Sequence, residues 1–213
     1  MPQSAPTVGQ LPLNFGPPGL MDRYLSWVKL SGDASKFNLD ALKLGLTFGE
    51  TPNNTFKWSN DEAPALHQWA LLGNPDAVYF FLDIGADIAL ADTCSRTALK
   101  YACAALNWAT TSYAEQAVKL LIDAGSDVNV KSTLGYTPLM WATRAGNLEI
   151  TQLLLEKGAN ANETDNNGYN ALYYAKNPRF KHNRLVTQNR KPTIDLLRKH
   201  GGKTGEELEA EGK

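Results

Sequence analysis

Apolar residues recur along this chain in two alternating kinds of segment. The first kind is short and rich in small residues, as in Leu139 to Ala145, and the second is an apolar run, as in Ile150 to Leu155. A polar stretch of roughly ten residues, rich in Asn, Asp and Gly, then leads to the next pair. This pattern predicts an all-α protein built of helix pairs joined by hairpin-like turns.

The helix pairs repeat with a fixed period. Pro64-Ala65-Leu66-His67 is followed by Gly85, and Thr137-Pro138-Leu139-Met140 is followed by Gly158, and in both copies the opening residue lies 21 positions before the glycine. Because one unit cannot bury its apolar face alone, a fixed period of this length predicts a solenoid of stacked units. We delimit four copies, at residues 61–91, 92–130, 131–162 and 163–203.

The boundaries of the predicted helices follow from residues that begin or end helices. Thr97, Thr137 and Asn170 precede the first helices of their units, where a side-chain oxygen can accept a hydrogen bond from the first turn. Pro138 follows in the first helical position, where its missing N–H costs nothing. Gly158 can adopt the left-handed conformation that ends a helix.

These repeated segments resemble ankyrin repeats. The signature of that family is a T-P-L-H start, a glycine between the helices and an L-L-x-x-G-A-D-V-N finish. Leu82 to Ile88, Leu121 to Asn129 and Leu154 to Asn162 are close to that finish. The resemblance implies an ankyrin-repeat solenoid that binds proteins on a concave surface of first helices and turn tips. It also implies a structural role for His67, whose ring would bridge backbone groups.

The remaining segments are expected to flank the stack. Residues 1–20 carry no charge and many prolines, which predicts an extended or disordered leader. Residues 21–60 are expected to form a degenerate N-terminal capping repeat, with helices at 24–30 and 37–44. Residues 204–213 form an acidic tail, and Thr204 to Glu207 is predicted to open a short helix as a capping box.

Two units are longer than the period, and the extra residues are predicted near 104–116 and 176–192. The second insertion is a basic loop, residues 176–191, without acidic residues. It either contacts an acidic protein surface or phosphates, or is only a solvated loop. Trp108, in the first insertion, either anchors an interface or folds back on the stack.

Aromatic residues also depart from the repeat. The first helices align Tyr101, Trp141 and Tyr174 in one column, which either faces a partner or packs between units. Aromatic residues are enriched at interfaces. The candidate partner-binding residues comprise this column, the turn tips and the two insertions, namely Arg96, Tyr101, Trp108, Thr133, Leu134, Tyr136, Trp141, Asn166, Tyr169, Tyr174, Arg179, Lys181 and Arg184.

Composition narrows the function only slightly. A net charge of −1 over 213 residues gives no overall field that would attract nucleic acid or membranes. No segment has the length of a membrane span, no secretory signal is evident, and the two cysteines favour a reducing compartment, so we expect a cytoplasmic monomer. No catalytic set, metal-ligand spacing or cofactor loop is recognisable, so we expect no catalytic activity, metal or cofactor.

The leading hypothesis is therefore a non-enzymatic scaffold that binds, and in one version inhibits, a specific protein through its groove, turn tips and inserted loops. The length and tail are similar to those of stand-alone bacterial ankyrin proteins, for which neutralising a toxin or a defence enzyme is one role. The alternative is an anion or nucleic-acid binder that uses the basic loop 176–191. An enzyme is a third class, for which no residue is a candidate.

Overall fold

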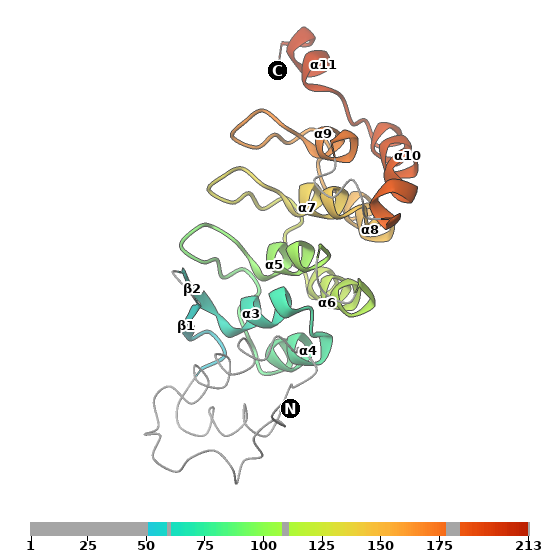
Figure 1. The fold of residues 1–213 in the computed structure, drawn as a ribbon. Helices are drawn as coiled ribbons and strands as arrows, with labels where there is room; N and C mark the ends of the chain where they lie inside the picture. Colours follow the sequence, from blue (N-terminus) through green and yellow to red (C-terminus); the bar gives the residue numbers. More distant parts are fainter. Residues whose placement is uncertain (1–50, 59–60, 108–110, 178–183, 213) are drawn as a thin grey trace, which may run out of the picture.

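The computed structural model describes residues 51–58, 61–107, 111–177 and 184–212. The described helices stack in two rows, with short helices toward the connecting hairpins and a second row behind them (Figure 1). We call these the inner row and the outer row. The inner row is α3 (Ala65–Leu72), α5 (Ala98–Ala105), α7 (Pro138–Ala145) and α9 (Ala171–Lys176), and the outer row is α4 (Pro75–Asp83), α6 (Thr111–Asp123), α8 (Leu148–Glu156) and α10 (Arg184–Lys199). This arrangement confirms the predicted all-α solenoid.

The ends of most helices follow the sequence. Thr137 accepts a hydrogen bond from the backbone of Met140, and Asn170 accepts one from Tyr173. Gly158 follows α8 with φ +88°, in the left-handed region. Thr97 is the exception, because it occupies the cap position of α5 but its hydroxyl accepts no hydrogen bond from the helix.

Small residues of the inner row and large apolar residues of the outer row form one continuous core. Ala98, Ala102 and Ala142 let neighbouring helices approach closely, and Phe81 and Leu154 fill the space behind them. All five side chains are fully buried. Burying a side chain such as Leu154 stabilises the fold by roughly 1.5–3 kcal/mol.

Each connection between units is a finger, defined here as residues 87–97, 127–137 or 160–170, which projects from the inner row (Figure 1). Neighbouring fingers are bonded at their tips: Thr133 donates its N–H to the Cys94 carbonyl at 3.0 Å, and Asn166 donates to Leu134 at 3.1 Å. At the finger base, Asn129 donates its side-chain amide to Gly158 at 3.0 Å. The fingers therefore add polar contacts between units to the apolar contacts of the helices.

A two-stranded hairpin precedes α3. Strands β1 (Thr55–Trp58) and β2 (Asp61–Pro64) pair antiparallel. The Asn53 side chain accepts the N–H of Asp87 at 2.7 Å, as Asn129 accepts that of Asn160 at 2.8 Å. The hairpin thus lies where the finger of a preceding unit belongs. The predicted helices of the capping repeat and the leader lie outside the described residues.

The described parts of both insertions contain more helix than the sequence predicted. Residues 184–191 were predicted as loop, but they form the first half of α10, in which Pro192 is an interior residue. The Asn189 amide donates to the Gly146 carbonyl at 2.9 Å, which fixes this extension against the end of α7. In the first insertion, α6 begins at Thr111 and is longer than α4 or α8.

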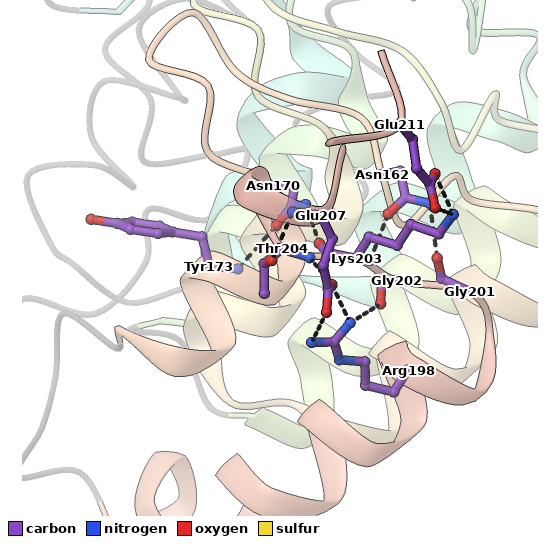
Figure 2. Close-up of polar contacts among 10 residues, drawn as sticks. All are labelled: Asn162, Asn170, Tyr173, Arg198, Gly201, Gly202, Lys203, Thr204, Glu207 and Glu211. Atoms are coloured by element: carbon purple, nitrogen blue, oxygen red, sulfur yellow. Dashed lines mark hydrogen bonds and ion pairs between the residues drawn. The ribbon is translucent and has the colours of Figure 1, made fainter. Parts of the chain in front are cut away.

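The C-terminal residues form α11 (Gly205–Ala210), which begins with the predicted capping box of Thr204 and Glu207. Arg198 contacts Glu207 through two hydrogen bonds, and Lys203 contacts Glu211 (Figure 2). The Asn162 side chain accepts the Lys203 N–H at 2.8 Å. Lys203 thus takes the position that a finger residue of a following unit would have. The C-terminal helix is therefore attached to the last unit by polar contacts of Arg198 and Lys203.

Candidate functional site

Five aromatic rings of the third and fourth units lie in contact with one another. We call Tyr136, Trp141, Tyr169, Tyr173 and Tyr174 the aromatic cluster. Tyr136 lies 5.5 Å from Trp141 and 5.7 Å from Tyr174 between ring centroids. Tyr169 and Tyr173 stack in parallel at 3.8 Å. The cluster combines two finger residues with three residues of α7 and α9.

The buried carboxylate of Asp165 is hydrogen-bonded to this cluster. The Tyr174 hydroxyl donates to Asp165 at 2.5 Å and lies 3.0 Å from the Tyr136 hydroxyl. Asp165 also accepts the N–H groups of Asn167 and Tyr169. Burial raises the pKa of Tyr174, and the bond to the carboxylate raises it further. Tyr174 therefore stays protonated and orders the finger.

The second unit repeats this pair. Tyr101 donates to Asp92 at 2.6 Å, and the Arg96 guanidinium contacts the same carboxylate oxygen at 2.6 Å. Burial opposes the ionisation of Asp92, but the hydrogen bonds from Tyr101 and Arg96 outweigh it and lower the pKa of that carboxyl. Two of the three column residues are therefore hydrogen-bonded to the finger of their own unit.

The third unit changes both members of the pair. Ser132 replaces the aspartate, and Trp141 replaces the tyrosine. The Trp141 indole N–H is buried and has no hydrogen-bond partner within the described chain. The Arg144 guanidinium lies 5.2 Å from the centre of the Trp141 ring. In the third unit, a cation and an indole therefore lie where the second and fourth units have a hydrogen bond between a tyrosine and an aspartate.

Several side chains around the cluster are open to solvent. Leu134 is 63% exposed at a finger tip, and Tyr169 and Tyr173 are 38% and 37% exposed. Thr133 and Asn166 are also exposed. The Tyr173 ring points away from the polar contacts that attach the C-terminal helix (Figure 2). This edge of the stack therefore offers both apolar and polar groups to a partner.

The structure brings together four of the candidate residues predicted in the third and fourth units, and the side chains of others are not described. Tyr136, Trp141, Tyr169 and Tyr174 meet in the cluster. Trp108, Arg179 and Lys181 lie outside the described residues, and Arg184 begins α10 without a described side chain.

Sequence reasoning missed Tyr173 and Arg144. Tyr173 lies in the same repeat position as His67, which suggested a structural role only. Arg144 follows Trp141 by three residues on α7, and this spacing places the two side chains on one helix face. The spacing of nine residues in Asp92–Tyr101 and Asp165–Tyr174 could have revealed the carboxylate pairs.

Three titratable side chains outside the aromatic cluster, those of His67, Lys100 and Cys103, are buried. The His67 Nε2 lies 3.0 Å from the Arg96 carbonyl, and burial lowers its pKa to about 4. Burial raises the pKa of the Cys103 thiol and lowers that of Lys100 to about 8. No group of three or more possible metal ligands occurs in the part of the chain that the structure describes.

Comparison with known proteins identifies the repeat. Residues 106–188 match the family model of ankyrin repeats, in three copies. No curated protein matches the chain. None of the described helices is long and apolar enough to cross a membrane.

Proposed function

This chain is an ankyrin-repeat protein, and we propose that it is a non-enzymatic scaffold that binds a specific protein through the aromatic cluster and the finger tips. Ankyrin repeats are generally protein–protein interaction modules. The observation that carries the proposal is the exposed edge of the third and fourth units, where Leu134, Tyr169 and Tyr173 are open to solvent. Large aromatic side chains with few rotatable bonds bind at little entropic cost.

The fixed conformation of this edge supports the proposal. Asp165 bonds Tyr174 and two finger N–H groups, so the finger is ordered before a partner arrives. A preordered surface loses less conformational entropy on binding. Inhibition of the partner, a monomeric state and a cytoplasmic location stay predictions.

Affinity capture with matched surface variants tests this function. Leu134→Ser with Tyr169→Ser removes apolar surface at the finger tips. Tyr79→Ser with Tyr113→Ser removes similar surface on the outer row, where these residues are 61% and 57% exposed. Captured proteins are identified by mass spectrometry from a lysate of the native host.

We expect the wild type and the outer-row variant to retain the same protein, and the finger variant to lose it. Urea denaturation of each variant checks that the fold is intact. Equal retention by all three proteins would contradict the proposed surface.

A further inference from the structure

Charge is distributed unevenly among the described helices. The charged residues of the inner helices are Lys100, Arg144 and Lys176, and none is acidic. The outer helices α4, α6 and α8 carry one cation, Lys119, which is paired with Glu149. Their acidic residues are Asp76, Asp83, Glu115, Asp123, Glu149 and Glu156. Helix α10, which also belongs to the outer row, carries five cations and one acidic residue. The acidic residues are therefore concentrated on α4, α6 and α8, and the cations on α10 and in the last turns of α7 and α9.

Three cations gather where α7 and α9 end and α10 begins. We call Arg144, Lys176 and Arg190 the basic cluster. The Arg190 guanidinium donates to the Lys176 carbonyl, and Asn189 fixes the neighbouring residue of α10 against Gly146 at the end of α7. None of the three side chains forms an ion pair with another described residue. Their charges are therefore available to a partner.

Helix dipoles explain only part of this arrangement. Arg144 and Lys176 lie in the last turns of their helices, where a cation is favourable without any ligand. Arg190 lies in the first half of α10, where the dipole gives no such benefit. It reaches Lys176 because the insertion extends α10 past the end of α7. The extension thus adds a cation to a site that already had two.

We infer that the basic cluster, with Trp141 beside it, binds an acidic segment of the protein partner. Arginine is suited to carboxylates because its planar guanidinium donates two parallel hydrogen bonds. The Trp141 ring, 5.2 Å from the Arg144 guanidinium, holds that cation against an aromatic surface. The inference rests on the proposed function and names the chemical class of the partner.

An acidic peptide segment fits better than a nucleic acid. The basic cluster is local, and acidic residues lie on α8 and on the C-terminal helix, as at Glu149, Glu156 and Glu206. A polyanion that extended past the cluster would meet these carboxylates and be repelled. A short acidic segment seated on the basic cluster avoids them.

The experiment measures binding of a fluorescein-labelled peptide of Glu-Glu-Leu triplets to the full chain by fluorescence anisotropy. Matched probes are a Lys-Lys-Leu peptide and a single-stranded DNA of similar length. Arg144→Gln with Arg190→Gln removes two charges from the basic cluster. Lys157→Gln with Lys199→Gln removes two charges at the ends of outer helices and is the control.

We expect the acidic peptide to bind and the basic peptide not to bind. The basic-cluster variant should weaken affinity about tenfold, and the control variant less than about twofold. Affinity should fall as salt rises from about 50 to 300 mM. Circular dichroism and urea denaturation confirm that both variants fold.

Four results would overturn the inference: no binding of the acidic peptide, equal loss in both variants, tighter binding of DNA, or a salt-dependent dimer in light scattering. The last would show that the acidic helices α4, α6 and α8 of a second copy occupy the site. The capture experiment separates the two proposals. Capture that depends on Leu134 and Tyr169 but not on Arg144 and Arg190 would leave the protein-binding function intact and exclude an acidic segment.

Discussion

At the scale of single residues, tyrosine hydroxyls and finger carboxylates form two equivalent pairs. Asp92 with Tyr101 and Asp165 with Tyr174 are each nine positions apart, and each connects a finger to its own inner helix. A buried carboxylate that loses a hydrogen-bond donor costs stability, because the charge is left with less solvation. These pairs therefore stabilise the finger conformation on which the proposed surface depends.

Removing the hydroxyl tests this role. Tyr174→Phe should lower the free energy of unfolding by about 1.5–3 kcal/mol, because Asp165 loses a charge-assisted hydrogen bond. Tyr113→Phe is the matched control, because this tyrosine is 57% exposed and should change stability by less than about 0.5 kcal/mol. Urea denaturation at neutral pH measures both. Equal stability of the two variants would contradict the role of the pair.

The buried His67 makes the free energy of unfolding depend on pH, and its pKa gives the direction. Burial lowers its pKa from 6.5 to about 4, so between these values the unfolded chain takes up the proton before the folded chain does. The stability that the neutral form of His67 contributes is therefore fully present above pH 6.5. It is lost progressively as the pH falls from 6.5 toward 4. At pH 5 this residue alone should lower the free energy of unfolding by at most about 2 kcal/mol.

The measurement compares urea denaturation at pH 7 and pH 5. His67→Gln should reduce the loss of stability between these values, while His200→Gln, at an exposed position, should leave it unchanged. Parallel pH profiles for the wild type and His67→Gln would show that the buried histidine does not carry this dependence.

At the scale of elements, the close contact between fingers depends on two glycines in different surroundings. Gly135 and Gly168 have nearly the same backbone conformation, with φ +80° and +79°. A Cβ at Gly135 would lie 2.7 Å from the Asp165 Cα, while a Cβ at Gly168 would have nothing within 4 Å. The pair therefore separates backbone strain from steric overlap between fingers.

Gly168→Ala should cost about 1–2 kcal/mol, because a left-handed conformation strains any residue with a side chain. Gly135→Ala should cost at least about 1 kcal/mol more than that, because the backbone of the next finger must move as well. Thermal or urea denaturation measures the difference. Equal costs would mean that Gly135 and the Asp165 backbone are not held in close contact.

At the scale of the whole molecule, stability is distributed along the stack because each unit contacts only its neighbours. Asn129 joins the second unit to the third through Gly158 and Asn160. Asn162 makes the equivalent bonds from the third unit's end to Gly201 and Lys203, next to the C-terminal helix. The same side chain therefore has different consequences at the centre and near the end of the stack.

Asn129→Ala should lower the free energy of unfolding by about 1–3 kcal/mol and broaden the urea transition, because two hydrogen bonds at a central interface are lost. Asn162→Ala should leave the urea midpoint nearly unchanged and reduce hydrogen-exchange protection over residues 203–212. A shift of the midpoint as large as that of Asn129→Ala would show that the C-terminal helix unfolds together with the stack.

The sequence by itself determined the repeat, the helix pairs and most helix ends, because these depend on local spacing and on single residues such as Thr137, Pro138 and Gly158. Only the tertiary structure decided how the aromatic column is used. Whether Tyr174 meets Asp165 or a partner depends on how the finger folds onto its helix, and its approach to Tyr136 depends on the packing of two units. The extension of α10 was decided in the same way, because its contact with Gly146 joins residues distant in sequence.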